Sequence, residues 1–163
     1  GNLNKAPFIN ELSSVNLNFK IWGSNTEEKK DRNIEFMGKK APDELIENIS
    51  QCTWGLVWDG ISINTCCGLL GTYLRFNNSH KCGLYLAARV PVIVWEESGM
   101  ASFVNKYKVG ICVSSLHDAA DIINCMDQKV YNIYKKNAQS IGQLISEGKF
   151  FLEALEKAEK ITN

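Results

Sequence analysis

Ser79, His80 and Lys81 stand at the start of a predicted helix and are suited to holding an anion. Asn77, Asn78 and Ser79 are short polar residues of the type that caps a helix. The first helical turn exposes N–H groups and a positive dipole end, which favour carboxylates. A Lys there costs about 0.3–1 kcal/mol when nothing offsets it, whereas a bound anion makes it favourable. The pattern predicts a phosphate-type site; the alternative is a solvated Lys beside an ordinary cap.

A second candidate lies where another predicted strand ends. Residues 54–59 are apolar until Asp59 and Gly60, and residues 61–72 lack a clear period, which indicates a loop. Ligands of open α/β sheets are bound in loops of this kind, after the carboxyl ends of strands. Asp59 can equally be an acid that only caps the loop.

Strands and helices alternate through most of the chain. An apolar, β-branched run over residues 90–95 predicts a strand covered on both faces. Further strands are predicted at residues 15–22, 33–37 and 110–113, and helices at residues 8–12, 41–49, 100–106, 117–126 and, divided near Gly148, 128–161. A charged loop is predicted at residues 25–32. This order predicts an α/β fold with a parallel sheet and helices on both faces.

The helical tail carries more apolar side chains than one domain needs to cover. We expect part of this surface to pack on the sheet and part to meet another domain or a second copy of the chain. The side chains concerned are Tyr131, Tyr134, Ile141, Leu144, Ile145, Phe150, Phe151, Leu152 and Leu155.

Composition narrows the function classes. The 163 residues have a net charge of zero with scattered Lys and Arg, which argues against nucleic acid or an anionic membrane as partner. No apolar run is long enough to span a membrane. Six cysteines without Cys-x-x-Cys pairs indicate reduced thiols in a cytoplasmic protein rather than a zinc or redox site. The absence of Gly-x-Gly-x-x-Gly argues against an ordinary NAD site. A flavodoxin-like signalling domain needs paired acids after an early strand, and the sequence has no such pair.

Four motifs carry a family resemblance. They are Gly1-Asn-Leu-x-Lys5, Gly55-Leu-Val-Trp-Asp-Gly60, Tyr73-x-x-x-Asn-Asn-x-His-Lys81 and Leu84-Tyr-Leu-Ala-Ala-x-x-Pro-Val-Ile-Val-Trp95. Over residues 1–116 the chain resembles bacterial GT-B glycosyltransferases, namely galactofuranosyltransferase-like enzymes and the glucosyltransferases that extend glycans on adhesins. The resemblance implies a Rossmann-like, nucleotide-sugar-binding C-terminal half over residues 1–163, with closing helices from about 128. Because the chain starts without Met, we expect an acceptor-binding domain upstream.

The resemblance also implies donor-binding residues. Lys81 matches the basic residue that contacts the donor diphosphate, and Asn78, Ser79 and His80 line the same helix start. Asp59 and Gly60 belong to the loop that faces the sugar and phosphates. The remaining matches are Lys5 and the Tyr73 hydroxyl near the diphosphate, and Phe36 and Met37 near the base. No catalytic base is matched, since in this fold it often lies in the other half.

The implied reaction moves glucose or galactofuranose from a UDP-sugar to a glycan or glycoprotein acceptor. Fixed cations and N–H dipoles stabilise the charge that builds on the leaving phosphate. No Asp-x-Asp occurs in the chain, so no metal or other cofactor is expected. The alternative is a nucleotide-binding or oligomerisation module without transfer activity of its own.

Overall fold

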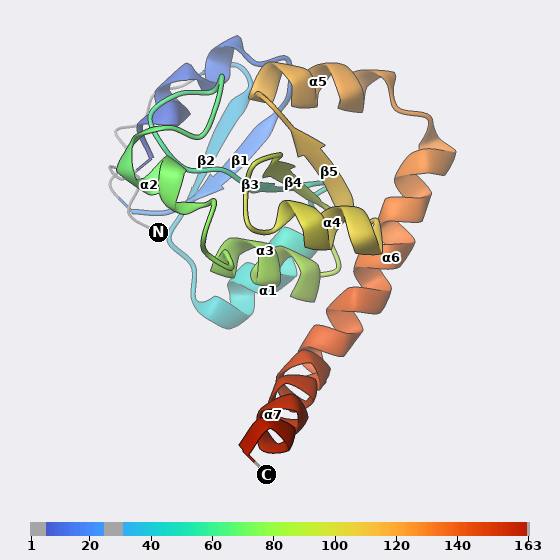
Figure 1. The fold of residues 1–163 in the computed structure, drawn as a ribbon. Helices are drawn as coiled ribbons and strands as arrows, with labels where there is room; N and C mark the ends of the chain where they lie inside the picture. The colour runs from blue at the N-terminus through green and yellow to red at the C-terminus, as the bar shows by residue number, and fades with distance from the viewer. Residues whose placement is uncertain (1–5, 25–30, 163) are drawn as a thin grey trace.

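The computed structural model describes residues 6–24 and 31–162 (Figure 1). The elements in chain order are the 3-10 helix η2 (Pro7–Ser14), β1 (Phe19–Trp22), β2 (Ile34–Gly38), α1 (Pro42–Ser50), β3 (Gly55–Val57), α2 (Gly68–Tyr73), α3 (His80–Ala87), β4 (Val92–Trp95), α4 (Ala101–Tyr107), β5 (Gly110–Val113), α5 (Leu116–Cys125), α6 (Gln128–Ser146) and α7 (Lys149–Thr162). Every strand and helix predicted from the sequence has a counterpart, and the first strand differs most in its bounds.

The predicted strand over residues 15–22 is wrong in its first half. Val15 closes η2 by donating its N–H to the carbonyl of Leu12, and β1 begins only at Phe19. The side-chain amide of Asn33 lies 2.9–3.2 Å from the carbonyl oxygens of Leu12, Val15 and Leu17. This amide satisfies the backbone there in place of a strand partner. Most of the predicted charged loop, residues 25–30, lies outside the described residues.

All described strand pairs are parallel, which confirms the predicted α/β fold with parallel strands. β1 pairs with β2, and β3, β4 and β5 form a second sheet in that order. The described strands therefore form two sheets instead of the single one predicted. The two sheets share one hydrophobic core, which includes Ile34 of β2 and Ile93 of β4.

Helices cover both faces of the three-stranded sheet, as predicted (Figure 1). Side chains that alternate along β4 point to opposite faces. Ile93 and Trp95 pack with η2 and α5, whereas Val92 and Val94 pack with α3, α4 and α6. All four residues of β4 are buried, which agrees with its apolar, β-branched sequence.

The tail forms two helices separated at Gly148, whose φ of +68° suits a glycine. α6 runs along the body and α7 projects from it (Figure 1). Tyr134, Ile141, Leu144, Ile145 and Phe150 pack on the two main cores, as expected for part of the tail. On α7, Phe151, Leu152 and Leu155 stay 67%, 53% and 45% exposed. Whether another domain or a second copy covers them stays a prediction.

Candidate functional site

Lys81 lies in the first turn of α3, close to the carboxyl end of β3. α3 starts at His80, with Ser79 as its N-cap residue and no acid in its first turn. The Ser79 side chain makes no capping hydrogen bond, while its carbonyl accepts from the N–H groups of Cys82 and Gly83. The helix ends at Ala87 because Arg89 takes a φ of 63° and Pro91 follows.

The ammonium group of Lys81 is already paired within the protein. Its Nζ lies 2.6 Å from Oδ1 of Asp59 and donates to the carbonyl of Trp58 at 3.1 Å. The side chain of Lys81 is 44% exposed and that of Asp59 is 24% exposed. Neither a bound anion nor solvent alone therefore has to offset the charge of Lys81. Asp59 supplies that offset from the neighbouring strand end.

Gly60 shapes the turn that places Asp59. Its φ is +114°, and a Cβ there would collide with the backbone of Cys67, so the position requires glycine. Gly71 also packs closely on the backbone of Cys66 and the carbonyl of Asp59. The segment after Gly60 thus folds back on the strand end. Residues 61–67 form a loop as predicted, whereas α2 over Gly68–Tyr73 corrects the second half of the loop predicted over residues 61–72.

The other predicted residues around Lys81 differ in accessibility. Asn78 and His80 are exposed, whereas Ser79 is buried at 9% exposure. Tyr73 ends α2 and is 58% exposed. Lys5 lies outside the described residues. The N–H of Phe8 donates to the carbonyl of Gly60 at 3.4 Å.

Phe36 and Met37 lie in β2, in the other sheet. Both are half-buried, and Phe36 packs against the core. Their predicted neighbourhood to a nucleotide base therefore stays a prediction, while Lys81, Asp59 and Gly60 are brought together at one strand end.

Arg75 and Glu97 are neighbours of the site that sequence reasoning missed. Arg75 forms an ion pair with Glu97 at 2.5 Å, and its guanidinium lies 5.0 Å from the ring centroid of Trp95. The N–H of Gly99 also donates to the carbonyl of Leu74 at 2.9 Å. These contacts tie the loop before α3 to the turn after β4. Glu97 follows a strand end just as Asp59 does, and this was the available signal.

Two buried polar atoms occur in the same two segments. Oδ1 of Asn77 and Oγ of Ser98 have no hydrogen-bond partner in the protein. Most buried polar atoms are hydrogen-bonded, so these two make the turn after β4 part of the candidate site.

The thiol beside the site is not a nucleophile. Burial raises the pKa of Cys66 to about 12, with a smaller lowering by a backbone hydrogen bond that involves Asp59. The reactive form of cysteine is the thiolate, which Cys66 does not populate near neutral pH.

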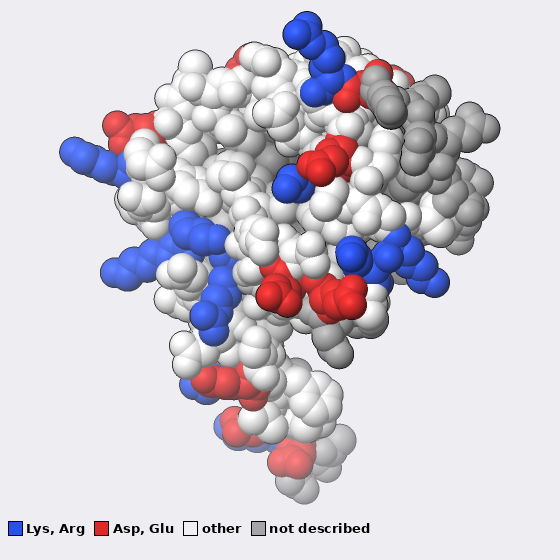
Figure 2. All heavy atoms as spheres, turned by 180° about the vertical axis from the view of Figure 1, so that it is seen from behind, with Lys and Arg blue, Asp and Glu red and all other residues white. Residues whose placement is uncertain are grey.

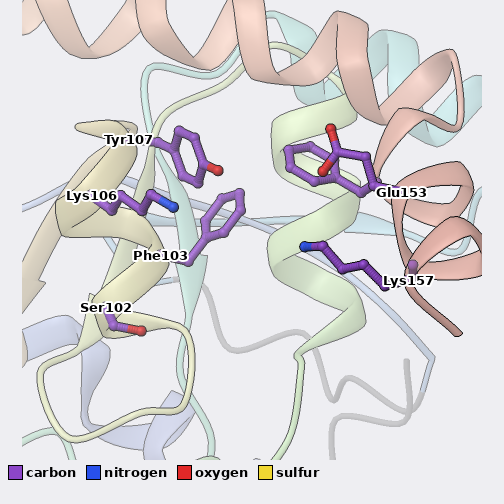
Figure 3. Close-up of a pocket in the computed structure, with 8 residues that line it drawn as sticks. Ser102, Phe103, Lys106, Tyr107, Glu153 and Lys157 are labelled. Atoms are coloured by element: carbon purple, nitrogen blue, oxygen red, sulfur yellow. The ribbon is translucent and has the colours of Figure 1, made fainter. Parts of the chain in front are cut away.

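A cleft lined by described residues lies elsewhere, between α4 and α7 (Figure 3). It encloses about 430 Å³. Phe103, Tyr107 and Phe150 form an aromatic cluster there, with ring centroids 4.6–6.3 Å apart. Lys106 and, across the cleft, Glu153 and Lys157 also line it (Figure 3). None of the predicted donor-binding residues lines it.

Basic and acidic side chains are interspersed over the face in Figure 2. Within residues 6–24 and 31–162, no group of three or more His, Cys, Asp or Glu side chains could hold a metal ion. No helix in this part of the chain has the length and hydropathy needed to cross a membrane.

Comparison with known proteins gives consistent matches. The family model described as "Glucosyltransferase 3-like, C-terminal domain" matches residues 1–158. The β-1,6-galactofuranosyltransferase WbbI of Escherichia coli (strain K12) is 34% identical over 142 residues, 85% of this chain and 42% of that protein. Glucosyltransferase 3 of Streptococcus gordonii is 29% identical over 135 residues, 83% of this chain and 40% of that protein. The chain thus spans about two fifths of the length of these relatives.

Proposed function

Because this chain belongs to the glucosyltransferase 3-like, C-terminal domain family, we propose that it is the donor-binding half of a glycosyltransferase. In this proposal it corresponds to the C-terminal half of a GT-B fold and binds a nucleotide sugar at the carboxyl edge of β3, β4 and β5. The names of the two relatives, a galactofuranosyltransferase and a glucosyltransferase, support this reaction class.

One observation carries the proposal: a lysine ammonium group is fixed at the start of a helix, beside a strand end. Lys81 brings a full positive charge to the turn where the N–H groups and dipole of α3 already favour an anion. Cleavage of a sugar–diphosphate bond builds negative charge on the leaving phosphate. A cation and N–H dipoles that are already in place stabilise that charge without reorganisation.

The finer proposal concerns the substrates. The donor is a UDP-sugar carrying glucose or galactofuranose, and the acceptor is a glycan or glycoprotein. Lys81 and the start of α3 supply positive charge, so the proposal needs no metal ion. We propose a cytoplasmic location, where the six cysteines, all free thiols, remain reduced.

Isothermal titration calorimetry with UDP, GDP, CMP and their sugars tests the donor assignment. We expect UDP and UDP-sugars to bind in preference to the others. A two-domain enzyme closes a cleft over its donor. Affinity is expected to be modest, because the donor-binding half alone supplies only one side of that cleft. Equal binding of all nucleotides would remove the UDP assignment, and no binding of any would reject the donor-site proposal.

A second candidate function is an assembly module without transfer activity. The exposed apolar side chains of α7, Phe151, Leu152 and Leu155, favour it because they offer a surface for a protein partner. A transfer assay on the chain joined to a relative's upstream half separates the two. Hexose transfer from UDP-sugar that is lost on Lys81→Ala supports the enzyme, and no transfer by the joined protein supports the module.

A further inference from the structure

We propose that Asp59 is a positioning residue for Lys81. In this role its carboxylate does not touch the donor but holds the ammonium group so that its remaining N–H can meet a donor phosphate. The inference rests on the proposed function, since it assigns a role at the same site. Protein kinases likewise use an acidic residue to hold a phosphate-binding lysine in place.

The donors of Lys81 explain why Asp59 can aim it. An ammonium group has three N–H donors. One donates to Oδ1 of Asp59 and a second to the carbonyl of Trp58. The third is left for a ligand, and the side chain is 44% exposed, so a ligand can reach it.

Both acceptors are themselves fixed. Trp58 is 1% exposed, and its indole N–H donates to the carbonyl of Ser62 at 3.0 Å. The backbone of Asp59 is fixed, because Gly71 packs against its carbonyl and Gly60 forms the turn that follows. The ammonium group is therefore held by rigid backbone and a short side chain.

Asp59 has two opposite effects on a bound diphosphate. Lysine side chains carry about 2 kcal/mol of rotamer entropy, so ordering Lys81 before binding is worth up to about thirtyfold in affinity. A carboxylate about 5 Å from a phosphate charge costs about fourfold when water screens it. The gain from positioning exceeds the repulsion while Lys81 is present. When Lys81 is absent, only the repulsion remains.

A double-mutant cycle measured by UDP affinity tests this reasoning. Asp59→Asn should weaken UDP binding by about five- to tenfold. In the Lys81→Ala background, the same substitution should strengthen binding by about two- to fourfold. The effect of Asp59→Asn thus changes sign with Lys81. Asp59→Glu, which keeps a carboxylate, should recover part of the wild-type affinity.

The controls separate positioning from structure. Glu147→Gln removes an acid from another ion pair, 3.1 Å from Lys149, and should leave UDP affinity and its salt dependence unchanged. Asp59→Asn should leave the melting temperature nearly unchanged. If Asp59→Asn tightens binding in both backgrounds, Asp59 is a competitor of the ligand; if it weakens binding equally in both, its role is structural. Either result overturns the proposed role of Asp59 and leaves the proposed donor site standing.

UDP binding by the wild-type chain distinguishes failure of the donor site from failure of the role of Asp59. UDP binding by the wild-type chain that does not change with Asp59→Asn would reject the role of Asp59 and leave the donor site standing. No UDP binding by the wild-type chain would reject the proposed function and the role of Asp59 together.

Discussion

Gly142 of α6 lies directly against the backbone carbonyl of Leu86 in α3. A Cβ at Gly142 would lie well under 3.0 Å from that carbonyl oxygen, so the two helices meet backbone to backbone. Gly142→Ala should therefore force α6 away from α3 and destabilise the protein by about 1–3 kcal/mol. Denaturant unfolding monitored by circular dichroism measures the loss.

Gly83 in α3 is the matched control for Gly142. A Cβ there meets nothing within 4 Å, and the residue has no positive φ. Gly83→Ala should stabilise the protein by about 0.5–1 kcal/mol, since alanine restricts the unfolded chain and favours the helix. Equal losses from the two substitutions would contradict the backbone contact between α6 and α3.

Lys81→Ala should separate binding from stability. The ion pair with Asp59 is partly exposed to solvent, so its loss costs about 1 kcal/mol, and alanine favours the helix. A charge-assisted hydrogen bond to a phosphate is worth about 1.5–3 kcal/mol, so UDP affinity should fall about ten- to a hundredfold. Lys81→Arg should rescue only part, because a guanidinium is a planar fork instead of a point charge. A variant that melts several degrees lower yet binds UDP normally would make Lys81 structural.

Stability should decline at alkaline pH because buried acids favour their neutral forms. Burial raises the pKa of Cys82 from 9.0 to about 12, and burial, with nearby charges, raises that of Tyr85 from 10.0 to about 12. A raised folded pKa means that the unfolded state loses its proton first. The stabilising contribution is complete below pH 9.0 and is lost as the pH rises towards about 12. Melting curves at increasing pH should show this decline, and Cys82→Ala should reduce its slope more than the exposed Cys125→Ala.

Phe150 and Phe151 are adjacent but differ in packing. The ring of Phe150 lies 5.9 Å from that of Phe103 and 6.3 Å from that of Tyr107, whereas Phe151 is 67% exposed. Phe150→Ala should cost about 1–3 kcal/mol and Phe151→Ala about 0.5 kcal/mol or less. Similar shifts in melting temperature would show that α7 is packed differently.

The exposed apolar side of α7 predicts association. We expect sedimentation velocity to show concentration-dependent self-association of the chain, and Ser in place of Phe151, Leu152 and Leu155 to reduce it. Lys157→Ser, on the cleft side of the same helix, serves as control. A wild-type chain that stays monomeric at every accessible concentration would leave this surface to a different partner.

The sequence was most informative where structure is local. The β-branched run of β4 and the polar cap of α3 predicted both elements almost residue by residue. The family resemblance also implied that Lys81 and Asp59 lie near the same donor phosphates. It could not show that they are paired, because 22 positions separate them and the pairing depends on how α3 approaches the end of β3.

The predictions that failed at α2 and at the start of β1 did so because of tertiary contacts. α2 contains Gly68 and Gly71, which weaken any helical pattern, yet Gly71 is needed where the helix packs on the backbone of Cys66. β1 begins late because the side chain of Asn33 bonds three carbonyls before it. Neither contact follows from hydrophobic periodicity, which describes one element at a time.

The division of the strands into two ladders has a consequence for native-state hydrogen exchange. The amides of β4 are bonded between β3 and β5, whereas β1 and β2 form a ladder of their own. Within the described residues, apolar packing rather than a shared ladder joins the two sheets. Such units open separately, each at its own free energy. The amides of β1 and β2 should therefore exchange with deuterium through sub-global openings, well before those of β4.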